Sequence, residues 1–165
     1  EICLKLEKLL YTKKEVCKIK EIKEKYIQNK DYYIMNPIKD ETLLINVPID
    51  NEKNLREVIT KEEAKKVIAN ISNIEPLDIN NKNIEFEYKQ LLNEDSLENL
   101  IKIIKTSYLR NFEREKNKKR ISDIDKNYFE KAEKRLYNEL SISLNLTYDE
   151  TKEYIINYLE NKNKD

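Results

Sequence analysis

The sequence predicts an α+β protein in which a small antiparallel β module is followed by a compact all-α helical domain. Up to Ile59 the apolar residues come in short runs rich in Ile, Val, Leu and Tyr, separated by charged residues or by Asn and Asp. This spacing is typical of a meander of short strands. From Thr60 onward the apolar residues recur at helical spacing instead. We therefore expect a β module over residues 1–59 and a helical domain over residues 60–165.

The β module is expected to hold short strands over Leu9–Tyr11, Val16–Ile27, Tyr32–Met35, Leu43–Val47 and Leu55–Ile59. The chain contains no glycine, so the usual glycine-containing hairpin turns are excluded. The turns must use residues that adopt turn geometry less easily, namely Asn29, Lys30, Asp31, Asp40 and Asn51. Proline cannot donate a hydrogen bond to a strand ladder, so Pro37 and Pro48 should lie at strand ends or bulges.

Polar residues mark the helix starts of the second domain. Thr60 and Thr147 each open a T-x-x-E capping box. Pro76 and the Asn-rich 80–83 stretch predict a connection, followed by a short helix over Ile84–Leu92. Asp95 or Ser96 is expected to cap a longer helix, and Ser122 the next one.

Apolar stripes at helical spacing identify the faces of these helices that should pack inward. The residues on them are Ala64, Val67, Ile68 and Ile71; then Leu97, Leu100, Ile101, Ile104, Tyr108 and Leu109; then Tyr128, Phe129, Ala132, Leu136 and Leu140; and finally Ile155, Tyr158 and Leu159. We expect the aromatic residues among them to be core residues rather than part of a cofactor site.

The composition argues against an enzyme. The chain has no His and no Gly, which removes the commonest general base and metal ligand and every Gly-rich phosphate loop. Cys3 and Cys17 lack C-x-x-C spacing, so we expect reduced, partly buried thiols rather than a zinc site or a disulfide. Carboxylate pairs such as Asp123 with Asp125 are better explained as partners of helix starts. We therefore expect no catalysis, cofactor, metal or small-molecule substrate.

No apolar run approaches the roughly 20 residues that span a bilayer, and the N-terminus lacks the apolar core of a signal peptide. This favours a cytoplasmic protein without membrane contact. The formal net charge of the chain is zero, yet the segment from Lys102 to Arg120 carries eight basic and two acidic residues. Such a run is more often a solvated loop than a phosphate-binding site, and both interpretations stay open on composition alone.

Seven sequence patches occur in an order that resembles one known family. They are Tyr11–Ile22, Tyr32–Met35, Leu43–Asn51 with its V-P-x-x-N end, Asn54–Ile59, Glu87–Lys89, Ile121–Lys126 and Ala132–Leu140. In this order they resemble the CarD-type (CarD/CdnL/TRCF) bacterial transcription regulators, and the resemblance covers nearly the whole chain. It implies a strongly bent, Tudor-like β module that binds the β subunit of RNA polymerase. It also implies a helical domain that contacts promoter DNA at the upstream edge of the transcription bubble and modulates open-complex stability, in a nucleoid-associated protein.

The resemblance also implies contact residues. Two arginines of the family's polymerase contact correspond to Lys25 and Asn46, and we expect Ile27 beside them. The family's wedging tryptophan corresponds to Ile84, with Phe86 nearby, while acidic residues replace its neighbouring arginines at positions 85–87. The DNA-binding residues expected from the resemblance and the basic run are Ile84, Phe86, Tyr88, Lys89, Arg114, Lys116, Lys118, Lys119, Arg120 and Lys126. The alternative is a polymerase- or protein-binding adaptor that keeps the β-module contact but does not bind DNA.

Overall fold

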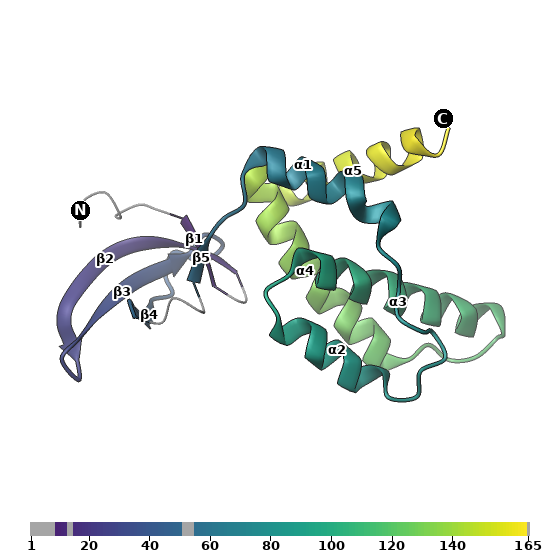
Figure 1. The fold of residues 1–165 in the computed structure, drawn as a ribbon, viewed down its shortest axis with the longest axis horizontal. Helices are drawn as coiled ribbons and strands as arrows, with labels where there is room; N and C mark the ends of the chain where they lie inside the picture. The colour runs from purple at the N-terminus through teal and green to yellow at the C-terminus, as the bar shows by residue number, and fades with distance from the viewer. Residues whose placement is uncertain (1–8, 13–14, 51–54, 165) are drawn as a thin grey trace. The chain divides into compact units, whose positions relative to one another are not determined.

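The computed structural model describes residues 9–12, 15–50 and 55–164. The chain divides into two compact units, residues 1–59 and 60–165, at the point where the apolar spacing changes. The first holds a curled five-stranded antiparallel sheet and the second is helical (Figure 1). The predicted α+β class, with a bent N-terminal β module and a helical domain, is therefore confirmed.

Five strands make up the sheet in the order β4-β3-β2-β1-β5. Every neighbouring pair is antiparallel. Pro37 and Pro48 are the last residues of β3 and β4, as expected for residues without an N–H donor. The strand bounds are β1 Leu9–Thr12, β2 Val16–Ile27, β3 Lys30–Pro37, β4 Ile45–Pro48 and β5 Leu55–Glu57.

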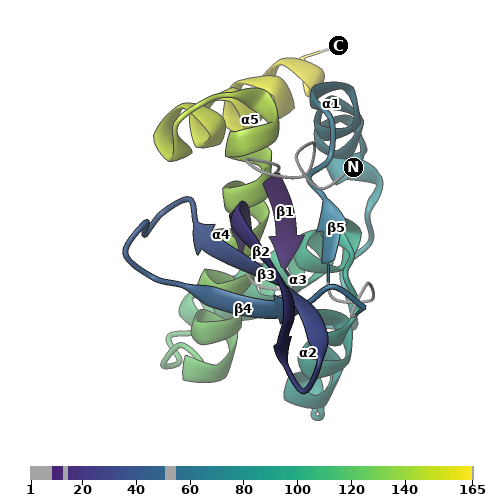
Figure 2. The same cartoon turned by 90° about the vertical axis from the view of Figure 1, so that its left-hand side faces the viewer.

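Register shifts in β2 account for the curl of the sheet. They fall between Ile19 and Glu21 and between Lys23 and Ile27. Extra residues on one strand bend it and increase its twist. The first shift also changes which residues face inward, so that Ile19 before it and Ile22 after it both join the core. In Figure 2, β4 runs across the direction of β1 and β5.

The β2–β3 hairpin turns without glycine. Gln28 and Asn29 both have left-handed backbone angles, with φ of 51° and 59°, and they link the paired residues Ile27 and Lys30. Two such residues form the turn whose twist suits a hairpin. Asn29 was expected in a turn; Lys30 and Asp31 instead belong to β3. The expected Asn51 turn lies outside the described residues.

The core of the β unit is small and apolar, with Leu10, Cys17, Ile19, Tyr33 and Met35 at its centre. Burial, and then the charge of Glu15, raise the pKa of the Cys17 thiol to about 11, so the thiol stays protonated at neutral pH. Cys17 is a free cysteine, while Cys3 lies outside the described residues.

Four of the helices in the second unit begin where the sequence places their caps. Thr60, Ser96, Ser122 and Thr147 each accept a hydrogen bond from the backbone N–H three residues on, and Ser96 rather than Asp95 is the cap of its helix. The bounds are α1 Lys61–Asn70, a 3-10 turn η2 Ile71–Asn73, α2 Ile84–Asn93, α3 Leu97–Lys116, α4 Asp123–Leu144 and α5 Tyr148–Lys162.

The inward face of α3 departs from the predicted stripe beyond Ile104. Tyr108 is 58% exposed and Leu109 is 36% exposed, so both predictions are wrong. The inward positions there are Ser107, which donates to the Ile103 carbonyl, and Arg110. The helix therefore buries polar groups with internal partners, which apolar periodicity cannot reveal. Tyr158, expected to face inward on α5, is also 36% exposed.

Candidate nucleic-acid interface

An extended segment, residues 74–83, is fixed along α3 by side chains of that helix. Lys105 donates from its Nζ to the Ile74 carbonyl at 2.7 Å, and Thr106 accepts the Leu77 N–H at 2.9 Å. Arg110 donates to the Ile79 and Asn81 carbonyls. These bonds satisfy backbone groups that have no secondary structure of their own. They hold the loop that carries Asn80, Asn81 and Lys82 against the C-terminal half of α3.

Arg110 is also half of a buried ion pair. Its Nε lies 3.1 Å from both carboxylate oxygens of Asp125, and the Tyr88 hydroxyl donates to the same carboxylate at 2.7 Å. The Asp125 side chain is fully buried and that of Arg110 is 13% exposed. Burial, followed by the hydrogen bond and charge of Asp125, raises the pKa of Tyr88. The triad joins α2, α3, α4 and the 79–81 loop, and it gives the buried carboxylate the ionic and hydrogen-bonding partners without which its burial would be costly.

The C-terminal end of α3 folds back on itself. Lys118 adopts a left-handed backbone with φ of 55°. Its N–H donates to the Glu115 carbonyl, and the Lys119 N–H donates to the Arg114 carbonyl at 2.8 Å. This is the Schellman pattern, usually made with glycine. It returns Lys119 to the level of Arg114, so two cations that are five positions apart lie together.

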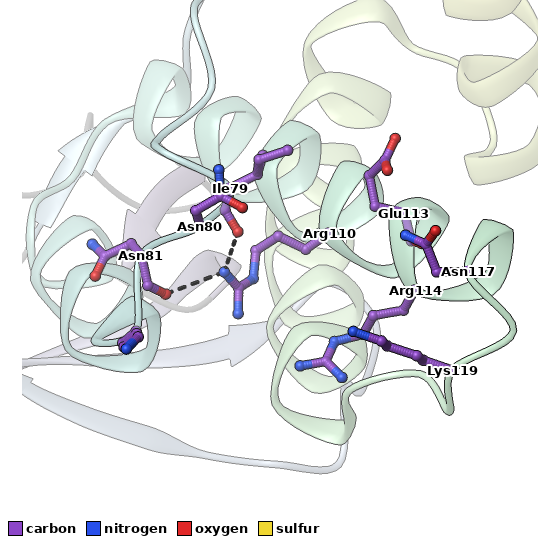
Figure 3. Close-up of a pocket in the computed structure, with 9 residues that line it drawn as sticks. Ile79, Asn80, Asn81, Arg110, Glu113, Arg114, Asn117 and Lys119 are labelled. Carbon is purple, nitrogen blue, oxygen red and sulfur yellow. Dashed lines mark hydrogen bonds between the residues drawn. The ribbon is translucent and has the colours of Figure 1, made fainter.

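The loop and the end of α3 line an open cavity of about 500 Å³, here called the basic pocket (Figure 3). Lys82 comes from the loop, Arg110 and Arg114 from α3, and Lys119 from the turn that follows it. The carboxylate of Glu113, the acidic member of the lining, points away from the Arg114 guanidinium in Figure 3. The remaining lining residues are Ile79, Asn80, Asn81 and Asn117.

Three of the four cations in the basic pocket have no counter-ion among the residues that the structure describes. Within residues 9–12, 15–50 and 55–164, no hydrogen bond or ion pair engages the side-chain nitrogens of Lys82, Arg114 or Lys119. Arg110, by contrast, is neutralised by Asp125. The basic pocket therefore presents uncompensated positive charge and amide groups to a ligand that would have to be anionic.

Two of the expected DNA-contacting residues belong to the core instead. Ile84 is 4% exposed and Tyr88 is fully buried, so neither can touch DNA, and this part of the expectation is corrected. Both residues lie on the inward face of α2, because they are four positions apart in the helix. Phe86 points outward and is 61% exposed. On the same outer side, Lys89 pairs with Glu85 at 3.5 Å.

The expected basic residues do not share one face. Arg114 and Lys119 line the basic pocket, whereas Lys126 lines a separate groove of about 300 Å³ with Tyr108 and Phe112 on the opposite side of α3. Lys116 and Lys118 are exposed and line neither cavity. Arg120 lies 3.4 Å from Asp123, in a pair so exposed that it contributes little.

Sequence reasoning missed Lys82 and the role of Arg110. Lys82 is an isolated cation in an Asn-rich loop, 32 positions before Arg114, and no local pattern joins the two. Arg110 was counted with the basic run although its charge is used inside the protein. The one available signal was Asp125, since a carboxylate on an inward helix face needs a cation nearby.

The residues expected to contact polymerase lie on two sides of the sheet. β1 pairs with β2 through Val16, Cys17 and Lys18, and in the described part of the chain no strand pairs with that side of β2 beyond Lys18. Lys25 and the 41% exposed Ile27 follow on this open side. Asn46 is exposed on the edge strand β4 and pairs with Ile34. β3 thus separates Asn46 from the other two residues.

The described residues form neither a metal-binding cluster nor a membrane-spanning helix. Within the described ranges, no three His, Cys, Asp or Glu side chains gather in a way that would hold a metal ion. Across those same residues, no helix combines the length and apolar character needed to cross a bilayer. No protein-family model matches the chain, and no curated protein matches it either.

Proposed function

We propose that this protein is a transcription regulator that binds the β subunit of RNA polymerase and contacts promoter DNA near the upstream edge of the transcription bubble. The observation that carries the proposal is the uncompensated positive charge of the basic pocket, which suits DNA phosphate. The same chain also has a curled sheet with open strand edges, which could bind a partner protein. The resemblance of seven ordered patches to CarD-type regulators supplies the partners. In this role the protein modulates open-complex stability, works at the nucleoid in the cytoplasm, and is not an enzyme.

The polymerase contact is proposed at the open side of β2, with Lys25 and Ile27, and at the β4 edge, with Asn46. An exposed strand edge offers backbone N–H and C=O groups to a partner strand. Side chains then tune the contact instead of providing most of it. The left-handed backbone of Lys25, whose N–H donates to Asp31 at 2.9 Å, sets the local shape of this edge.

The DNA contact is proposed at the basic pocket and the exposed cations Lys116 and Lys118. Phosphate contacts of this kind position a protein on DNA without reading sequence. Phe86 takes over the wedge role that the resemblance gives to position 84, because it is the exposed apolar side chain of α2. A protein that holds polymerase and DNA together gains affinity through effective concentration, so neither contact need be strong alone.

A second candidate is an adaptor that binds polymerase but not DNA. It is favoured by the acidic residues Glu85 and Glu87, which flank Phe86 on α2 and repel phosphate, and by the burial of Ile84. The uncompensated charge of the basic pocket argues for the DNA-binding regulator instead.

Co-purification with core RNA polymerase tests the shared part of both candidates. Wild-type protein should be retained, and Lys25→Glu and Asn46→Glu should each weaken retention. Lys152→Glu makes the same charge change as Lys25→Glu, and a larger one than Asn46→Glu, on the exposed side of α5; it is the control and should behave as wild type. If polymerase retains neither the wild type nor the control, polymerase binding is contradicted. If it fully retains both β-unit variants, the interface lies elsewhere on the protein.

Binding to fork-junction DNA separates the two candidates. The regulator should bind such DNA at low salt in the presence of polymerase and lose affinity steeply as salt is raised. Absence of DNA binding under these conditions, with polymerase retained, would establish the adaptor.

A further inference from the structure

We infer that the basic pocket is a binding site for a single phosphate group, held jointly by Lys82, Arg114 and Lys119. The inference deepens the proposed DNA contact and rests on it for the identity of the partner. It assigns the ligand group and one new residue, Lys82, and it separates these three cations from the other basic residues of the run.

The backbone brings all three cations to the lining of one cavity. Lys119 reaches the level of Arg114 because the Schellman bonds fold the end of α3 back. Lys82 reaches the same cavity because Arg110 binds the Ile79 and Asn81 carbonyls and so fixes the loop just before it. In Figure 3 the Arg114 and Lys119 side chains both extend from the end of α3 toward that loop. A site whose frame is fixed before binding loses less entropy when the ligand arrives.

The chemistry of the lining selects phosphate. Three unpaired cations around one cavity match an anion with several oxygens and more than one negative charge. The guanidinium of Arg114 can form two parallel hydrogen bonds to such a group, while the two lysines act as point charges. The Arg110 guanidinium is already bonded to Asp125 and to the loop carbonyls, so it forms part of the pocket wall and is not expected to bind the ligand.

The size of the basic pocket bears on where the phosphate comes from. Its volume of about 500 Å³ exceeds what one phosphate fills, which leaves room for an attached sugar or a flanking nucleotide. Both the DNA backbone and a free nucleotide present the same phosphate chemistry to these residues. The proposed function favours the DNA backbone, and the experiment separates the two sources.

The first arm titrates the full-length protein with pyrophosphate and follows the backbone amides of residues 80–82 and 117–119 by NMR. Lys82→Gln, Arg114→Gln and Lys119→Gln should each weaken binding about tenfold, as expected for loss of one charge-assisted bond in a shared site. Lys131→Gln and Lys152→Gln remove the same charge from exposed positions of α4 and α5 that do not line the pocket, and should change affinity less than about twofold. Equal effects in both groups, or no saturable binding, would overturn the inference.

The second arm measures fork-junction DNA affinity against salt for the wild type and for the triple Lys82→Gln/Arg114→Gln/Lys119→Gln variant. Three cations that share one phosphate should reduce the slope of log affinity against log salt by about 0.9, whereas three separate contacts would reduce it by about 2.7. A reduction near the larger value, or an unchanged slope in a variant with native helicity, would overturn the single-phosphate site while leaving DNA binding in place. A third outcome is that the protein does not bind DNA but binds pyrophosphate and nucleotide through the pocket. That result would uphold the phosphate site and assign it to a free nucleotide, and the DNA part of the proposed function would fail.

Discussion

Arg110 and Arg114 lie one turn apart on α3 and line the same cavity, yet their surroundings are opposite. Arg110 is neutralised by a fully buried Asp125 and binds two loop carbonyls. Arg114 has no ion pair or hydrogen bond of its guanidinium within the described residues. The buried network therefore holds the helical unit together, and the basic pocket beside it offers charge to a ligand. Charge counted along the sequence does not distinguish these two uses, whereas the location of the counter-ion does.

The largest expected effect comes from removing Arg110. Arg110→Met should lower the free energy of unfolding by about 3–5 kcal/mol, because it leaves the Asp125 carboxylate buried without its cation. Arg114→Met, one turn away, should change it by less than about 0.5 kcal/mol. Urea denaturation followed by circular dichroism measures both values. Equal free energies of unfolding for the two variants would contradict the claim that Arg110 stabilises the fold and Arg114 does not.

A smaller loss is expected when the third member of the network is trimmed. Tyr88→Phe removes the hydroxyl that donates to Asp125 at 2.7 Å, and hydrogen bonds to charged groups contribute about 1.5–3 kcal/mol. Tyr108→Phe removes an exposed hydroxyl from α3 and serves as the control. If both substitutions leave the urea midpoint unchanged, the Tyr88 hydroxyl does not support the carboxylate.

The same hydroxyl gives the network a dependence on pH. The pKa of Tyr88 is raised in the folded protein, chiefly by burial, from an ordinary value of 10.0. Stability from this group is therefore complete below pH 10 and is lost as the pH rises above it, since the unfolded chain then releases a proton that the folded chain keeps. Tyr88→Phe should lose less stability between pH 9 and 11 than the wild type does. Identical profiles for the two proteins would contradict the raised pKa.

A still smaller effect on stability is expected from the cap of α4, which fixes the helix start that carries Asp125. Ser122 accepts the Asp125 N–H at 3.2 Å, so Ser122→Ala should cost on the order of 1 kcal/mol. Ser122→Asp keeps a capping oxygen and should stay near the wild type. A melting curve unaffected by the alanine substitution would count against this helix boundary.

The sequence was sufficient for features set by local chemistry. The caps at Thr60, Ser122 and Thr147 were predicted because a hydroxyl three residues before a backbone N–H acts within one turn. The strand order along the chain, and Pro37 and Pro48 at strand ends, follow from similar short-range rules. The strong bend of the sheet came only from the resemblance, since the register shifts of β2 depend on its pairing with β3.

Features that depend on distant partners were missed. The inward positions of α3 include Ser107 and Arg110, whose partners give no apolar signal, and Tyr108 and Leu109 were placed inside in their stead. Ile84 and Tyr88 were assigned to DNA although the packing of α2 buries them. Lys82 entered the site only through the contacts of Arg110 with its loop. Tyr88, Arg110 and Lys82 were misjudged because the contacts that place them join residues far apart in the sequence. Ser107 was missed because its local bond to the Ile103 carbonyl gives no apolar signal.

The wedge and the phosphate contacts should separate in their response to salt. Phe86→Ala should shorten the lifetime of the open complex without changing the salt dependence, because an apolar wedge acts on base stacking and not on counter-ions. Ile84→Ala should instead lower stability, as expected for a core residue. A salt slope altered by Phe86→Ala, or an unchanged open-complex lifetime, would exclude the wedge.

The most direct test of the central claim is the salt dependence of fork-junction DNA binding by the protein bound to RNA polymerase. The claim is that the cations at the end of α3 touch DNA phosphates while the β unit holds the polymerase. Replacing Lys118, Lys119 and Arg120 together with alanine should flatten the slope of log affinity against log salt by about one unit if Lys118 contacts a phosphate of its own while Lys82 and Arg114 keep the phosphate of the basic pocket. The slope would flatten by up to about three units if each of the three residues contacted a separate phosphate. The same slope for the wild type and this variant would contradict the claim.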